Sequence, residues 1–133
     1  MIPKFRAWDK RFSEFVEDFF VSEDGKIYKK TKDTGYGFAI SRETSNKIIL
    51  MQSTGLFDRN GKEIFEGDIL ACKTDDEVIN LNVFWDEEHA LFMFESKKYN
   101  EQEPLAELVE NNTYPFEIIG NVYENPELLE ELR

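Results

Sequence analysis

Extended runs in which apolar and polar residues alternate dominate the second half of the chain. The run VINLNVFW, residues 78–85, has apolar residues at every second position from Ile79 to Trp85, so one side of a strand would be wholly apolar and suited to burial. Turn residues separate such runs at intervals of roughly eight to twelve residues, and this spacing predicts antiparallel hairpins in a small barrel or roll. Comparable runs lie at residues 47–53, 69–73, 90–96 and 116–125.

The first half of the chain has a more mixed pattern. Residues 1–8 alternate and suit a short strand, and the DG pair at residues 24–25, between apolar pairs, predicts a two-residue hairpin turn. The apolar residues at 12–21 fit either a helical stripe or two strands, because their spacing suits a helix while Phe and Val favour strands. A polar loop follows, with a brief strand expected at residues 36–40.

The segment QSTGLFDRNGKEIFEGDIL, residues 52–70, is rich in turn-forming residues. Asn60 and Gly61 tolerate positive φ, so they predict a type I′ turn between two short strands. Gly67, between two acidic residues, suits a tight corner or a bulge. A calcium-binding loop is excluded, because Lys62 would stand at a position where that loop needs an oxygen ligand. We assign a structural turn role to Gly55, Asp58, Asn60, Gly61, Glu66, Gly67 and Asp68.

Two short helices are expected in the second half. Residues 104–111 begin with Pro at the first helical turn, where its missing N–H loses no hydrogen bond, and they carry a short apolar stripe. Residues 126–132 begin with Pro126 after Asn125, which is a favourable N-cap residue. The pattern therefore predicts a mainly β (α+β) chain with short helices near its end.

Charge is divided unevenly along the chain. The net charge is −12; residues 1–50 hold ten Lys/Arg and eight Asp/Glu, a balance of +2, and residues 51–133 hold six and twenty, a balance of −14. The acidic half would repel a phosphate backbone and is typical of a solvated surface, or of a surface that imitates DNA. We expect an N-terminal β-hairpin subdomain over residues 1–50 and a barrel subdomain over residues 51–133, unless both form one continuous domain.

Cysteine content and hydropathy bear on the compartment. The single cysteine, Cys72, excludes an internal disulfide and a cysteine-based zinc cluster, and it fits a reducing compartment. The apolar runs are far too short to span a bilayer, and the first residues carry no signal-peptide pattern. We therefore expect a soluble cytoplasmic protein with no membrane contact.

No residue set has the spacing of a catalytic, cofactor-binding or metal site. His89 is the only histidine, and it lies among acidic residues in an expected hairpin turn, where an exposed polar role is the simplest interpretation. Cys72 lies within an apolar strand and suits a small buried side chain. Phosphate-binding glycine spacings are absent, and a carboxylate pair would need a cleft for which a small barrel leaves little room. We expect no enzymatic activity and no cofactor.

Basic and aromatic residues occur together only in the first half of the chain. Such mixtures are typical of small barrels that bind single-stranded nucleic acid. Core aromatics with ordinary flanking lysines would give the same sequence. The candidate interaction residues are Arg6, Trp8, Lys10, Lys29 and Lys30.

Three segments resemble the YopX family of phage and prophage proteins. They are IPKFRAWDK at 2–10, MQSTGLFDRNGKEIFEGDIL at 51–70 and FEIIGNVYENPELL at 116–129, in the family's order and over nearly the full length, whereas residues 12–46 do not match. The resemblance implies a mostly β protein with an SH3-like barrel or roll in the second half, so it favours strands at 12–21. It also implies a phage or prophage origin and a bacterial cytoplasm, but no activity and no catalytic residues.

The resemblance, the missing catalytic set and the acidic second half together favour a phage or prophage accessory protein that is not an enzyme. We expect a β module that binds a protein partner or associates with itself. The alternatives are a nucleic-acid-binding barrel that uses the first half, an acidic imitation of DNA, and a hydrolase that uses carboxylates.

Overall fold

The computed structural model describes residues 3–30, 35, 40–44, 46–111 and 113–130 of the 133-residue chain. Strands make up 52% and helices 9% of the described residues, which confirms the mainly β prediction. The chain divides into an N-terminal unit, Ala7–Leu50, and a half-barrel unit, Met1–Arg6 with Met51–Arg133. The half-barrel unit thus includes the first six residues, which the sequence boundary at residue 50 had assigned to the other subdomain.

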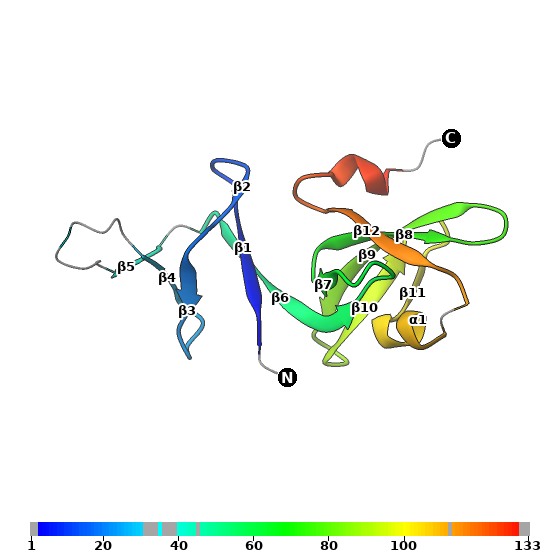
Figure 1. Ribbon diagram of the computed structural model, residues 1–133, viewed down its shortest axis with the longest axis horizontal. Coiled ribbons are helices and arrows are strands. Elements are labelled where there is room, and N and C mark those ends of the chain that lie inside the picture. Colours follow the sequence, from blue (N-terminus) through cyan, green and yellow to red (C-terminus); the bar gives the residue numbers. More distant parts are fainter. Residues whose placement is uncertain (1–2, 31–34, 36–39, 45, 112, 131–133) are drawn as a thin grey trace. The chain divides into compact units, whose positions relative to one another are not determined.

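Each unit has its own set of strands. The N-terminal unit holds β2 (Glu14–Phe15), β3 (Phe19–Val21), β4 (Ile27–Lys30) and β5 (Ile40–Arg42), and the chain passes between the units within β1 (Phe5–Asp9) and β6 (Ile48–Phe57). The half-barrel unit holds β7 (Glu63–Phe65), β8 (Asp68–Lys73), β9 (Val78–Asp86), β10 (Leu91–Ser96), β11 (Glu101–Pro104), α1 (Leu105–Asn111), β12 (Phe116–Asn121) and the 3-10 helix η1 (Pro126–Leu129) (Figure 1).

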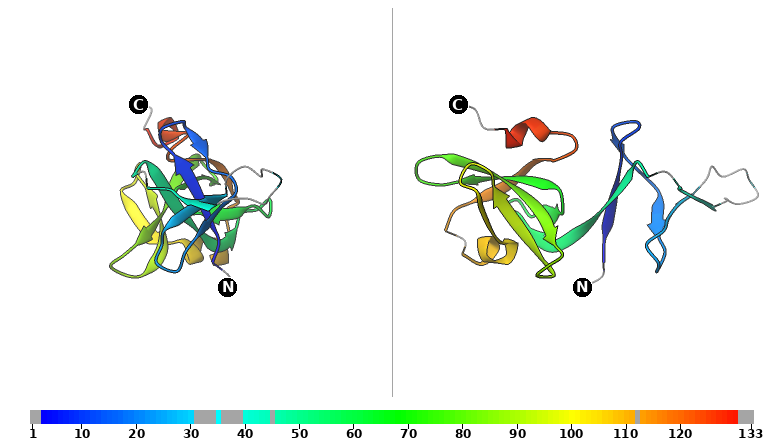
Figure 2. Two further views of the ribbon diagram at one scale, coloured as in Figure 1. Left: turned by 90° about the vertical axis from the view of Figure 1, so that its left-hand side faces the viewer. Right: turned by 180° about the vertical axis from the view of Figure 1, so that it is seen from behind.

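The half-barrel unit is built on one curled antiparallel sheet with the strand order β11-β10-β9-β8-β12 (Figures 1 and 2). Leu81 of β9 stands opposite Leu70 of β8, and Val83 of β9 stands opposite Phe94 of β10. Alternate residues from three strands therefore face one interior, as the pattern of residues 78–85 predicted. The last strand, β12, returns to pair with β8 and completes the sheet.

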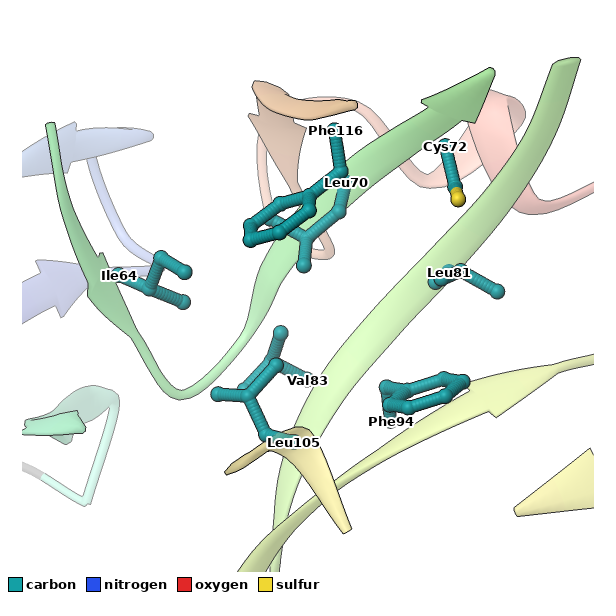
Figure 3. Packing of buried hydrophobic residues seen from close by; sticks show 8 residues of the cluster. All are labelled: Ile64, Leu70, Cys72, Leu81, Val83, Phe94, Leu105 and Phe116. Atoms are coloured by element: carbon teal, nitrogen blue, oxygen red, sulfur yellow. The ribbon is translucent and has the colours of Figure 1, made fainter. Parts of the chain in front are cut away.

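The hydrophobic core lies within the curl of this sheet. Figure 3 shows its side chains converging from β7, β8, β9, β10, α1 and β12. Trp85 departs from the expected apolar side of β9, because it lies at the strand's end, is 41% exposed and packs edge-on against Phe92 with ring centroids 4.9 Å apart. The buried members of the core are Ile64, Leu70, Cys72, Leu81, Val83, Phe94, Leu105 and Phe116.

The two expected helices differ in form. α1 follows directly after Pro104, which ends β11. At the second site residues 126–129 form only a 3-10 turn, and residues 131–132 lie outside the described residues. The side chain of Asn125 does not cap this turn; its Oδ1 instead accepts a hydrogen bond from the Asn121 N–H at 3.3 Å. Within the described part of the chain, no helix has the length and apolar character needed to cross a membrane.

The hairpin turn at residues 58–62 differs from the expected type I′ turn. Gly61 has φ +78°, but Asn60 does not adopt positive φ. The Gly61 N–H donates to Asp58 O at 3.0 Å, and the Asp58 N–H donates to Lys62 O at 2.9 Å. Asp58 Oδ1 also accepts the N–H groups of Asn60 and Lys62, each at 2.9 Å. The Asp58 side chain thereby stabilises a wider loop in which glycine alone takes the left-handed conformation.

The N-terminal unit contains the sheet β3-β4-β5 and the β1–β2 pair. Residues 12–21 therefore form strands, as the resemblance favoured, and each strand follows a residue with positive φ, Ser13 or Asp18, which a helix does not accommodate. The hairpin at residues 24–25 is wider than expected, because only its glycine has positive φ. Of the strand expected at residues 36–40, only the last residue lies among those described, where it begins β5.

Candidate functional site

Arg6 forms a buried ion pair with the last residue of the turn motif. Arg6 Nη2 lies 2.7 Å from Asp68 Oδ1, and Asp68 Oδ2 accepts the Phe65 N–H at 2.8 Å. The Arg6 guanidinium also lies over the Phe65 ring, 5.0 Å from its centroid. The Asp68 side chain is 2% exposed. Arg6 is therefore engaged inside the half-barrel unit rather than presented to a nucleic acid.

Asp68 has the unusual titration expected of a buried carboxyl group. Burial raises its pKa, and this effect outweighs the attraction of Arg6 and the hydrogen bond from Phe65, both of which lower it. A carboxyl group with a raised pKa can act as a general acid or base where a substrate reaches it. Asp68 is too deeply buried to meet a substrate, so its ion pair serves the fold.

Asp58 links the hairpin turn to the last strand. Its Oδ2 accepts the N–H of Ile118 at 2.9 Å, across 60 positions of sequence. Burial opposes ionisation of Asp58, but three backbone N–H groups, including that of Ile118, outweigh it and lower the pKa of the carboxyl group. Asp58 is therefore a charged structural link and not an exposed ligand.

Gly67 and Glu66 connect the same motif to neighbouring strands. Gly67 has φ +88°, donates its N–H to Val83 O at 2.7 Å and accepts the Val122 N–H at 2.8 Å. Glu66 Oε1 accepts the Gln52 N–H at 3.0 Å. Because these polar groups are already bonded to the backbone of the half-barrel unit, they stabilise its fold.

The other candidate interaction residues are dispersed. Trp8 is 4% exposed, and its ring packs edge-on against Phe15 with centroids 5.0 Å apart. Lys29 is half-buried, and it lies on the face of β4 opposite to Lys30 because neighbouring residues of a strand alternate. Lys10 is exposed in the turn after β1. Within the N-terminal unit, Trp8 is buried and Lys29 and Lys30 lie on opposite faces of β4, so these three residues do not form one exposed face.

His89 and Cys72, the candidate nucleophilic or acid–base residues, lie in surroundings that do not favour these roles. His89 Nδ1 lies 2.7 Å from Asp86 Oδ2 in the β9–β10 turn, and the His89 side chain is 64% exposed. Glu88 adds a further ligand atom near this pair. Cys72 is buried, and burial raises the pKa of its thiol, which makes it a poor nucleophile. His89 and Cys72 thus have the exposed polar role and the buried apolar role that the sequence predicted.

A groove of about 220 Å³ opens on the surface of the half-barrel unit, beside the β6–β7 turn and the start of β12. Two aromatic residues of this groove are unusually open to solvent: Phe57 is 50% exposed and Tyr114 is 38% exposed. Phe116, by contrast, is buried and belongs to the core. The residues that line the groove are Phe57, Asp58, Arg59, Val109, Tyr114, Pro115 and Phe116.

Backbone bonds and core packing hold this groove in shape. The Arg59 N–H donates to Phe116 O at 3.2 Å, and Val109 of α1 packs against the hydrophobic core. The Arg59 side chain is exposed, and it makes no ion pair or hydrogen bond with a residue that the structure describes. Exposed aromatic rings beside a guanidinium group are the combination that protein interfaces favour. The groove can therefore take up an apolar side chain together with a carboxylate.

Comparisons with known proteins agree with this architecture. The family described as YopX protein matches residues 4–130. Protein EF1440 from Enterococcus faecalis, whose crystal structure is solved, is 31% identical, with a TM-score of 0.66 over 98% of this chain and 99% of that one. Protein yopX from Bacillus subtilis has the same fold at 22% identity, with a TM-score of 0.66 over 95% of this chain and 97% of that one. No curated protein matches the chain. The chain therefore belongs to the YopX family, as its three motif segments indicated.

Proposed function

We propose that this protein is a binding module without catalytic activity, and that its groove beside β12 docks a segment of another protein. The observation that carries this proposal is the exposure of Phe57 and Tyr114 in one groove with Arg59. Large aromatic side chains are normally covered by the rest of the fold, and an exposed cluster of them indicates a contact surface.

The chemistry of the groove favours a particular kind of partner segment. Phe57 and Tyr114 offer apolar area whose burial would contribute roughly 25 cal/mol per Å². Arg59 can pair with a carboxylate through two parallel N–H groups. The half-barrel unit holds eight Lys/Arg against twenty Asp/Glu, so it would repel an acidic partner surface elsewhere. The favoured segment carries an apolar side chain beside one carboxylate, on a partner that is otherwise neutral or basic.

A non-enzymatic role is supported by the surroundings of the reactive groups. The Asp68 carboxyl group and the Cys72 thiol are buried, while His89 is exposed in a hairpin turn, so these three residues do not share a pocket. The resemblance of the chain to a family of phage and prophage proteins supports an accessory role inside a bacterial host. That role in the host cytoplasm is part of the same proposal.

A pull-down from bacterial lysate with a groove variant tests the proposal. We expect the Phe57→Ser/Tyr114→Ser variant to recover the wild-type protein's partner at least about tenfold less, because each exposed aromatic contributes more than about 1 kcal/mol when it is an interface anchor. The lysate is treated with nuclease beforehand, so that only protein contacts are scored. Analytical ultracentrifugation of the same variant shows whether a second copy of this chain is the occupant.

The matched control is Phe12→Ser in the N-terminal unit, where Phe12 is 67% exposed. This control makes the same chemical change on an exposed phenylalanine outside the groove, and we expect it to recover the partner fully. The proposal is wrong if the folded groove variant recovers the same proteins in the same amounts as wild type and also sediments identically.

A further inference from the structure

The small sheet of the N-terminal unit presents a row of aromatic and basic residues that the proposed groove does not use. Strand β4 lies between β3 and β5 (Figure 1). Its Tyr28 stands opposite Phe20 of β3 and opposite Arg42 of β5. Residues that stand opposite one another on adjacent strands share a face, so these three side chains lie in one row across the sheet. Lys30 and Ile40 form the next row on the same face.

One ring of the aromatic pair in this row, that of Phe20, is open to solvent, while Tyr28 is half-buried. The rings of Phe20 and Tyr28 are nearly parallel, with an interplanar angle of 11° and centroids 5.5 Å apart. Phe20 is 46% exposed, and Arg42 at the end of the row is also exposed. The Arg42 guanidinium makes no ion pair or hydrogen bond with any described residue. The exposed Phe20 ring therefore shares a row with a cation that has no ion-pair or hydrogen-bond partner among the described residues.

The charge of this sheet is favourable for an anion. Its three strands, FFV, IYKK and ISR, contain three cations and no acidic residue. The N-terminal unit as a whole has eight Lys/Arg and eight Asp/Glu, so the net charge of −12 resides in the half-barrel unit. Two of the acidic residues, Asp9 and Glu43, are paired with Arg11 at 2.9 and 3.3 Å.

We propose that this face of β3-β4-β5 binds single-stranded nucleic acid. A base stacks on the exposed ring of Phe20, continuing the Phe20–Tyr28 pair, and phosphates further along the nucleic-acid strand pair with Lys30 and Arg42 where that strand crosses β4 and β5. An acidic peptide could also pair with Arg42, but it would make no stacking contact with the Phe20 ring. A nucleic-acid base is flat and stacks on such a ring, so nucleic acid is the favoured ligand. These binding residues, Phe20, Tyr28, Lys30 and Arg42, differ from the interaction residues predicted from the sequence. Only Lys30 belongs to both sets.

Fluorescence anisotropy with a labelled oligothymidylate of about ten nucleotides tests this proposal on the full chain. We expect saturable binding that weakens about sevenfold between about 50 and about 200 mM NaCl, since two phosphate contacts to a single strand give this salt dependence. Phe20→Ala should weaken binding by about 5- to 150-fold, the range measured for loss of one stacked base. Arg42→Ala should weaken binding and reduce the salt slope by about half.

Two controls separate this proposal from its alternatives. Phe12→Ala removes an exposed phenylalanine of the same unit from a turn outside the sheet and should bind as wild type, as should the groove variant Phe57→Ser/Tyr114→Ser. Polyglutamate should not compete with the oligonucleotide. Wild-type binding by both Phe20→Ala and Arg42→Ala, no binding by the wild-type protein, or equal competition by polyglutamate would each overturn the proposal. Arg42 is exposed on its strand, so its variant tests the proposal even if Phe20→Ala is unfolded.

Discussion

Replacing Arg6 by methionine should lower the free energy of unfolding by about 3–5 kcal/mol, as measured by urea denaturation at neutral pH. The substitution leaves the Asp68 carboxylate, 2% exposed, without its cation. A buried charge that loses its ion-pair partner is far less stable than one exposed to water. The Arg6–Asp68 pair is therefore expected to be the most sensitive polar contact of the fold.

The pH dependence of this variant follows from the pKa of Asp68. Burial already raises that pKa in the folded protein, and removal of Arg6 raises it further. A raised folded-state pKa penalises the fold above that pKa, and the penalty disappears below the unfolded value of about 3.8. The Arg6→Met variant should therefore approach wild-type stability as the pH falls towards that value.

A second ion pair provides the control for Arg6→Met. Lys4 Nζ lies 3.1 Å from Glu63 Oε1, but the Lys4 side chain is 64% exposed. Lys4→Met should leave the unfolding transition almost unchanged, because exposed pairs contribute little. Our interpretation of Asp68 is wrong if Arg6→Met and Lys4→Met have the same stability.

Gly67→Ala should destabilise the protein more than Gly61→Ala, although both glycines have positive φ, +88° and +78°. At Gly61 an added Cβ meets no atom within 4 Å, so only backbone strain of about 1–2 kcal/mol is expected. At Gly67 the same atom would lie 2.9 Å from the sulfur of Met51, which is itself 2% exposed. Overpacking should add about 1–3 kcal/mol to the strain. Urea denaturation measures both losses, and equal losses would show that Met51 moves aside freely.

The strands of the half-barrel could be predicted because one local rule determines each of them. Leu81 and Val83, which alternate along β9, are apolar and buried. The helix α1 begins directly after Pro104, the residue from which its start was predicted. The end of the same strand could not be predicted from alternation. Trp85 continues the apolar side of β9, but it lies beyond the curl of the sheet and is 41% exposed.

The turns show where local rules were insufficient. Asn60 and Gly61 suit a type I′ turn, but the side chain of Asp58 bonds two N–H groups of the loop and one on β12, and this favours a wider turn. The bond to β12 spans 60 positions of sequence, so no local pattern contains it. Asn125 is a comparable case, because its side chain bonds Asn121 instead of capping the helix.

The candidate binding sites could be predicted from the sequence less well than the strands and turns. Trp8 and Arg6 are residue types that nucleic-acid surfaces use. Trp8, however, is buried against Phe15, and Arg6 pairs with Asp68. The exposed aromatics that remain, Phe20 and Phe57, stand among many phenylalanines that look alike in the sequence. Strand register places Tyr28 between Phe20 and Arg42, and this register cannot be read from the spacing of these residues in the sequence.

The segment that identifies the family, residues 51–70, contributes Phe57, Asp58 and Arg59 to the groove, whereas the sheet face of Phe20 lies outside that segment. Asp58, Gly67 and Asp68 bond to the backbone or to Arg6 inside the half-barrel unit. Asp58 also lines the groove, but the exposed side chains proposed for binding, Phe57, Tyr114 and Phe20, are outside that set. Variants of the motif should lose stability first, and variants of the two surfaces should lose binding first.

Amide hydrogen exchange tests most directly whether the motif is structural. The N–H groups of Ile118 and Phe65 bond to the carboxylates of Asp58 and Asp68, at 2.9 and 2.8 Å. The Glu88 N–H makes the same kind of bond to Asp86, at 3.0 Å, in an exposed hairpin turn. We predict that Ile118 and Phe65 exchange as slowly as the core amides of β8 and β9, through global unfolding, while Glu88 exchanges rapidly. Exchange of Ile118 and Phe65 at the rate of Glu88 would contradict the structural role of the motif.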